Sequence, residues 1–247
     1  MATLKRILLV FTFVSATAAQ SSEPPLSDSR LTVHTLLRED IFAGFMANDM
    51  QRFARAEHNI DVLLEQRPAE RANLLAWKAG TQFYRAVLAH EAHQPAEFKR
   101  LYQHVLELFE EAGKLPSGND GVAAITGGSH VGFADRLPEE YRAAAWSRAL
   151  ASYQLLWKAQ SGILDKLPLH FKGELLAGLT QSAERTGHTD EAVQYLDKML
   201  EVLQGTPYEP MAKRWKENPA VAANTSLACK SCHEPGRLSA RLEALNH

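Results

Sequence analysis

The sequence predicts an all-α protein, and three observations lead to this fold class. Over most of the chain beyond residue 30, apolar residues recur at spacings of three and four, which places them on one face of a helix. No run of useful length alternates apolar and polar residues as a half-buried strand does. Small residues and prolines recur at intervals that indicate paired helices. With 45% apolar and 23% charged residues, the composition suits a globular protein.

Residues 1–19 have the organisation of a secretory signal peptide. A basic Lys-Arg pair precedes a short apolar run at residues 7–14, and small residues follow, which predicts cleavage after Ala18 or Ala19. The apolar run is too short to cross a bilayer as a helix, and an uncleaved anchor is the alternative. We therefore expect a periplasmic or secreted protein with no membrane span after signal cleavage.

Residues 20–30 are polar, contain two adjacent prolines and predict a disordered arm. The helical body is expected over residues 31–217. Its first helix pair is indicated by Gly44, Ala56 and Pro68, which stand twelve residues apart. Small residues let paired helices approach, and proline ends the second helix. This spacing resembles the tetratricopeptide repeat, which implies antiparallel helix pairs.

Further helix pairs follow along the body. Segments 74–89 and 98–112 form a degenerate pair, and the apolar residues of the second segment lie on a single helix face. Segment 176–203 again resembles the tetratricopeptide repeat. There Gly187 is placed to end one helix in a left-handed conformation, and Asp190 is placed to cap the next.

One stretch interrupts the helical pattern. Residues 113–138 hold six of the fourteen glycines and predict a long glycine-rich loop before another helix at 141–159. Loops of this length often have a function, and one interpretation is a loop that folds over a ligand or over the edge of a cofactor. The sequence slightly favours the other interpretation, a surface excursion between helix pairs.

The most specific motif lies close to the C-terminus. Cys229 and Cys232 are the only cysteines, and His233 follows the second one, which gives the C-x-x-C-H spacing of a covalent haem site. This spacing lets two thiols reach the two vinyl groups of one porphyrin while the next residue brings an imidazole to the iron. Covalent haem attachment takes place outside the bacterial cytoplasmic membrane, so the motif and the signal peptide support each other.

The same two cysteines allow other interpretations. A redox-active dithiol shares this spacing but occurs at a strand-to-helix turn, and no strand pattern surrounds residue 229. A structural zinc site needs a second pair of ligands, and residues 234–247 offer none at comparable spacing. A disulfide across two residues closes a small, strained loop and stabilises little. Haem is therefore favoured, with a dithiol as the next alternative.

The motif resembles the attachment site of c-type cytochromes. The resemblance implies that Cys229 and Cys232 form thioethers to one covalent haem c and that His233 is the proximal iron ligand. A small cytochrome c has its motif early in the chain, whereas only fourteen residues follow His233 here. The four-helix cytochromes of the c-prime type continue a helix through the histidine, whereas Pro235-Gly236 breaks it here.

The whole chain most resembles tetratricopeptide-containing c-type haem proteins, with residues 218–247 as a haem-carrying C-terminal segment docked on the helical body. Residues 237–245 predict a short closing helix. Its Arg237 and Arg241 are placed to pair with haem propionates, or else to form a solvated helix face. The pattern does not define the sixth iron ligand, and an open iron is one alternative. The candidate ligands are Met211, His130, His170 and His247. Met211 shares a helix face with Trp215, and this spacing favours a core role over ligation.

Charge and motifs exclude several function classes. The formal net charge of −2 becomes more negative when the basic leader is removed, so no basic field for nucleic acid or anionic lipid exists. Nucleotide-binding glycine loops, nucleophile elbows and the H-E-x-x-H spacing are missing. We expect one-electron transfer with a periplasmic redox partner, for which the helical body is the binding surface. The alternatives are a haem-stapled interaction scaffold or haem-based sensor, and a peroxidase-like haem enzyme.

Overall fold

The computed structural model describes residues 26–116 and 119–227. Within these residues it contains helices and turns but no strand, which confirms the all-α prediction. None of the described helices combines the length and the apolarity needed to cross a membrane. The α-helices are α1 (Val33–Ala47), α2 (Met50–Gln66), α3 (Arg71–Glu91), α4 (Pro95–Lys114), α5 (Asn119–Phe133), α6 (Glu139–Gln160), α7 (Leu169–Arg185), α8 (Thr189–Val202), α9 (Glu209–Glu217) and α10 (Pro219–Asn224).

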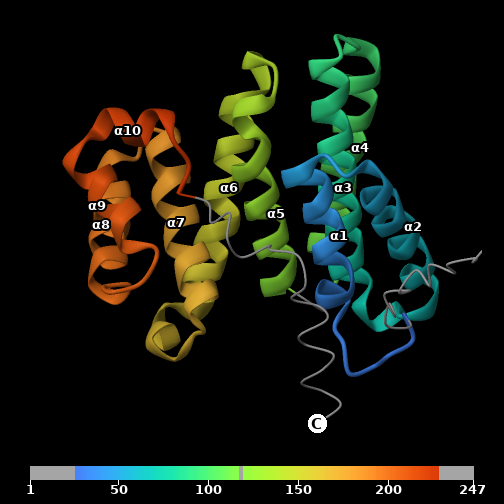
Figure 1. The fold of residues 1–247 in the computed structure, drawn as a ribbon, viewed down its shortest axis with the longest axis horizontal. Helices are drawn as coiled ribbons and strands as arrows, with labels where there is room; N and C mark the ends of the chain where they lie inside the picture. Colours follow the sequence, from blue (N-terminus) through green and yellow to red (C-terminus); the bar gives the residue numbers. More distant parts are fainter. Residues whose placement is uncertain (1–25, 117–118, 228–247) are drawn as a thin grey trace, which may run out of the picture.

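Consecutive helices pack side by side, and the resulting pairs stand in a row that runs from the blue and green helices to the red ones (Figure 1). The most extensive packing joins α1 with α2, α3 with α4, α5 with α6, and α7 with α8. Contacts of α3 with α5 and of α6 with α7 connect one pair to the next. At the end of the row, α9 packs on α8, and α10 packs on α7 and α9.

The buried faces of these helices follow the apolar periodicity of the sequence. The predicted helices at 74–89 and 141–159 lie within α3 and α6. In α4 the apolar residues at spacings of three and four are the buried ones. Burial of such a stripe, rather than intrinsic propensity, stabilises most helices in proteins. The buried residues of α4 are Phe98, Leu101, Tyr102, Val105, Leu108, Phe109 and Ala112.

A glycine allows the first two helices to approach closely. Gly44 of α1 lies against Phe53 of α2, where an added Cβ would stand 2.5 Å from the ring. Between the helices, Asn48 adopts the left-handed conformation, and the Asp49 side chain caps α2. Pro68 opens a 3₁₀ turn directly after α2, as expected of the residue that ends this helix.

The turn between α7 and α8 follows the prediction in one respect and differs in another. Gly187 has the expected left-handed conformation, with φ of 78°. The capping role expected of Asp190 is wrong, because His188 occupies the N-cap position. The backbone N–H of His188 donates to the carbonyl of Ala183, so the turn closes there and α8 begins at once. Asp190 instead lies in the first helical turn, where its negative charge interacts favourably with the positive end of the helix dipole.

The predicted glycine-rich loop at 113–138 is wrong. α4 continues to Lys114, and α5 forms from most of the remaining residues. Gly127 of α5 lies against Tyr153 of α6, where a Cβ would stand 2.9 Å from the ring, and Gly178 of α7 lies against the same ring. These glycines therefore permit close packing around one buried tyrosine, and this packing outweighs their low helix propensity.

The predicted disordered arm at 20–30 is wrong for the part that the structure describes. Arg67, at the end of α2, donates hydrogen bonds to the carbonyl oxygens of Leu26 at 2.5 Å, Asp28 at 2.8 Å and Leu31 at 2.7 Å. A guanidinium group presents several donors in a fixed geometry, so one side chain holds three points of the main chain. A polar composition alone could not reveal this partner.

Candidate functional site

The predicted haem-attachment residues lie outside the described part of the chain, as does the predicted signal peptide. The site can therefore be built from the residues that hold the chain just before the first cysteine and from the helices around them. Leu227 is the last residue described, and the following predicted site residues come after it: Cys229, Cys232, His233, Arg237, Arg241 and His247.

Gln181 of α7 fixes the main chain two residues before Cys229. Its side-chain oxygen accepts hydrogen bonds from the backbone N–H of Leu227 at 3.0 Å and from the hydroxyl of Ser226 at 3.2 Å. Gln181 and Leu227 are 2% and 4% exposed. Buried polar groups are costly to leave without partners, so these bonds hold the chain at one point on α7.

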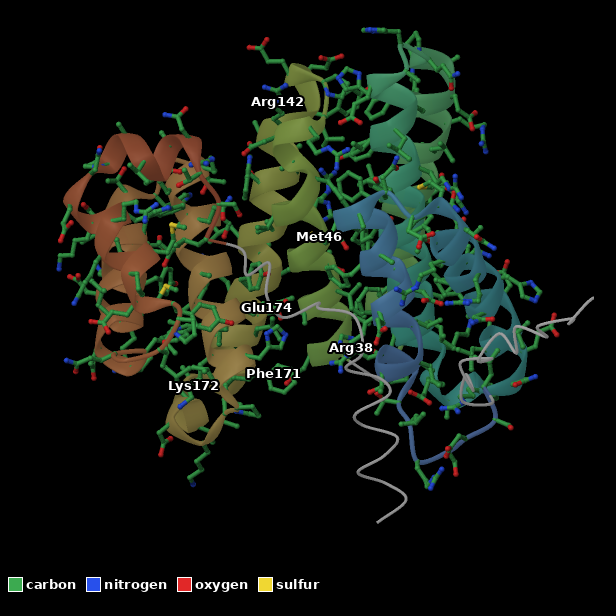
Figure 2. All side chains as sticks on the ribbon, viewed as in Figure 1. Arg38, Met46, Arg142, Phe171, Lys172 and Glu174 are labelled. Carbon is green, nitrogen blue, oxygen red and sulfur yellow. The ribbon has the colours of Figure 1, made fainter. Side chains whose placement is uncertain are left out.

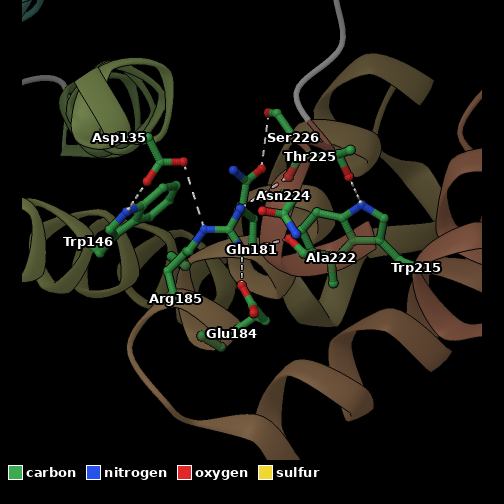
Figure 3. A network of polar contacts seen from close by, with 12 residues as sticks. Asp135, Trp146, Gln181, Glu184, Arg185, Trp215, Ala222, Asn224, Thr225 and Ser226 are labelled. Carbon is green, nitrogen blue, oxygen red and sulfur yellow. Dashed lines mark hydrogen bonds and ion pairs between the residues drawn. The ribbon is translucent and has the colours of Figure 1, made fainter. Parts of the chain in front are cut away.

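Arg185, one helical turn further along α7, holds the same segment from a second side (Figure 3). Its guanidinium donates to the carbonyl oxygens of Ala222 at 2.6 Å and Thr225 at 3.2 Å. The guanidinium also lies over the ring of Trp146 in α6, 5.6 Å from its centroid. Asp135 stands 3.8 Å from Arg185 and accepts a hydrogen bond from the Trp146 indole. The Trp146 ring thus covers the Arg185 guanidinium, and the Asp135 carboxylate offsets its positive charge.

Trp215 of α9 completes this set of contacts. Its indole N–H donates to the Thr225 hydroxyl at 2.9 Å, and its ring is buried. We call Gln181, Arg185 and Trp215, together with the residues 222–227 that they hold, the C-terminal anchor. The anchor extends the folded body to Leu227, well beyond the boundary at residue 217 that the sequence suggested.

Met211, a predicted candidate for the distal ligand, lies on α9 with its side chain half-buried. It packs against the apolar cluster that also contains Trp215, Tyr208 and Ala212. This is the core role that its spacing from Trp215 favoured. The thioether contributes to packing where it stands, since methionine fills irregular spaces next to aromatic rings.

His130, the other distal candidate named by the sequence, is fully buried in α5. Its Nδ1 donates to the carbonyl of Thr126 at 2.8 Å, so Nε2 is the unprotonated nitrogen, and it has no hydrogen-bond partner among the described residues. Phe83 and Phe109 lie against the ring, with centroids 5.1 and 5.4 Å away. Burial lowers the His130 pKa to about 4. An iron centre could reach Nε2 only if this core opened.

Two histidines far apart in the sequence approach each other near α1 and α7. Burial lowers the pKa of His34 on α1 to about 4, and the positive charges of Arg38 and His170 add to this effect. His34 also packs against Trp77, with ring centroids 5.2 Å apart. The charge of His170 on α7 therefore acts across the space between the two helices.

Glu174 supplies the acidic group of this region. Its Oε2 lies 3.4 Å from Nε2 of His170, and each of the two side chains is 34% exposed. Burial among neighbouring helices raises the Glu174 pKa to about 7. Figure 2 shows Arg38 on α1 and Phe171 and Glu174 on α7 on one side of the molecule. We call His34, Arg38, His170, Phe171 and Glu174 the α1–α7 face.

Sequence reasoning named His170 as one isolated candidate and did not find the other members of this face. No spacing rule connects His34 on α1 with His170 on α7, because their proximity is produced by the stacking of helix pairs. Across residues 26–116 and 119–227, no group of three or more histidine, cysteine or acidic side chains could hold a metal ion.

Comparison with known proteins adds no family to these observations. The chain matched no protein-family model, no curated protein and no solved structure. Its function must be inferred from its residues.

Proposed function

We propose that this protein is a periplasmic c-type haem protein that transfers single electrons. A row of helix pairs would carry one covalent haem on its C-terminal segment. The observation that carries the proposal is the C-terminal anchor, which fixes the main chain at Leu227, two residues before Cys229. A cofactor attached at that point would have a defined position relative to the folded body.

The residues that would hold the haem are Cys229 and Cys232 through thioethers and His233 through its imidazole. When bound, the haem supplies a one-electron redox couple whose potential depends on axial ligation, burial and nearby charge. The chain's own contribution would be to position the attachment segment through the C-terminal anchor. Of the two histidine candidates in the described body, His130 is fully buried and His170 is partly exposed.

The helical body is proposed to resemble tetratricopeptide repeats and to bind the redox partner. The packing of consecutive helices and the close approach at Gly44 support this resemblance. Rows of helix pairs present an extended surface on which partner proteins bind. The proposed repeat architecture bears on how the protein binds its redox partner, and the haem attachment does not depend on it.

The deciding experiment is expression with haem-maturation machinery, followed by haem staining of the denatured protein. We expect the parent chain to retain haem covalently and Cys229→Ala/Cys232→Ala to lose it. Ser231→Ala is the matched control, because it changes the motif interior and keeps both thiols and the imidazole. A parent protein without retained haem would contradict the proposal, and a thiol titration would then test the dithiol alternative.

A redox titration followed by visible spectra tests electron transfer itself. We expect reversible one-electron reduction of a six-coordinate iron that does not bind carbon monoxide. An open iron that binds small ligands would instead favour the haem-based sensor or the peroxidase-like enzyme.

A further inference from the structure

We propose that the α1–α7 face is the docking surface for residues 228–247 of this same chain, the segment expected to bear the haem. This inference rests on the proposed function, because the docked segment is the one proposed to carry the haem. It assigns a place on the body to a segment whose position the sequence does not define.

The first argument is the point at which the described chain ends. Leu227 is bonded to Gln181, and α7 runs back from Gln181 to His170 over about 16 Å at the usual helical rise. The six residues from Ala228 to His233 span at most about 20 Å when extended. The attachment motif can therefore reach the face.

The second argument is the exposure pattern of α7. From Leu175 to Ala183 every residue of this helix is buried. Near its N-terminus, by contrast, His170 and Glu174 are each 34% exposed and Phe171 is 54% exposed. A segment that leaves α7 at Gln181 therefore finds the accessible surface of this helix in its first turns.

The third argument is chemical complementarity. Haem carries two propionate carboxylates, and the face contains the Arg38 guanidinium and the partly exposed His170 imidazole, both of which are hydrogen-bond donors to carboxylates. Residues 237–245 place Leu238, Leu242 and Leu245 at helical spacing, and such a stripe requires an apolar surface to cover. The exposed Phe171 ring offers one.

The test uses the full haem-loaded chain and tryptic cleavage after Arg237 and Arg241, followed by mass spectrometry. If the segment docks on the face, Arg38→Glu/Phe171→Glu should speed cleavage at these two sites at least tenfold. Leu155→Glu/Lys158→Glu is the matched control, because it makes the same charge change at exposed positions of α6. Circular dichroism of each variant establishes that the body remains folded.

Two results would overturn the proposal. One is a cleavage rate in the face variant within twofold of the parent rate. The other is equal acceleration in the α6 control, which would show a response to charge rather than to the face. Haem staining of the same samples is read separately. Loss of haem from the parent would refute the proposed function, whereas cleavage rates that do not depend on the face would refute the docking surface alone.

Discussion

Glu174 and His130 respond to pH in opposite directions because burial disfavours the charged form of each. The Glu174 pKa is raised to about 7 in the folded protein, so the stability it contributes is complete below the unfolded value near 4.5 and is lost as pH rises through 7. The His130 pKa is lowered to about 4, so its contribution is complete above the unfolded value near 6.5 and is lost as pH falls towards 4.

For Glu174→Gln we expect greater stability than the parent above pH 7 and little difference near pH 4.5, because an amide cannot ionise. The measurement is the free energy of unfolding by urea across this pH range. Glu140→Gln, at an exposed site in the first turn of α6, serves as the control. A parallel pH dependence in parent and Glu174→Gln would show that the carboxyl is ionised in the fold.

For His130→Leu we expect a haem spectrum identical to that of the parent. We also expect its free energy of unfolding to decrease less than that of the parent between pH 6.5 and 4. The removed pH dependence should be about 3 kcal/mol, from about 1.4 kcal/mol per unit of pKa shift. Spectra at neutral pH and urea unfolding at several pH values measure the two effects. A changed spectrum would return His130 to the list of iron ligands.

At the scale of elements, two glycines of α5 allow a direct comparison. Gly127→Ala would place a Cβ 2.9 Å from the Tyr153 ring, whereas an alanine at Gly132 would contact nothing within 4 Å. We expect Gly127→Ala to destabilise the protein by about 1–3 kcal/mol through overpacking. Gly132→Ala should stabilise it by about 0.5–1 kcal/mol through helix propensity. Thermal unfolding measures both, and equal effects would mean that α5 does not pack on Tyr153.

The C-terminal anchor is tested by Arg185→Leu. This change removes donors from two carbonyl oxygens, and we expect a loss of about 2–3 kcal/mol and faster hydrogen exchange over residues 222–227. Lys198→Met removes the exposed ion pair with Glu201 and should cost at most about 1 kcal/mol. If the exchange of 222–227 is unchanged in Arg185→Leu, the anchor is held by other contacts.

Sequence patterns predicted those elements whose signals are local. The apolar stripe of α4 and the left-handed Gly187 depend on residues within a few positions, and both are found in the structure. α5 was missed because the packing that accommodates one of its glycines, Gly127, involves a tyrosine on another helix. The C-x-x-C-H motif is likewise local, whereas the anchor that precedes it combines side chains from two helices, α7 and α9.

At the scale of the whole molecule, the body is a row in which each helix pair contacts its neighbours. His34 and His170 approach each other only because intermediate helices set the distance between α1 and α7. No rule applied to one segment can supply that distance. This explains why sequence reasoning found the C-x-x-C-H motif but only one residue, His170, of the surface proposed to receive it.

Two truncations test where the body ends. A chain that stops after Leu227 should keep its helical content and cooperative unfolding, because the anchor is complete. A chain that stops after Val221 should have a markedly lower Tm, because Gln181 and Arg185 lose buried partners. Thermal unfolding of the two chains followed by circular dichroism measures this difference. Equal Tm values would show that the anchor does not stabilise the body.

The C-terminal anchor also has a consequence for the order of biosynthesis. Within the part of the chain that the structure describes, the side chains that hold residues 222–227 precede them in the sequence. Because a nascent chain emerges from its N-terminus, the helical row can fold completely before Cys229 is available. If haem is attached as proposed, the attachment enzyme would meet the two thiols on a folded body, and folding of the described residues would not have to wait for the cofactor.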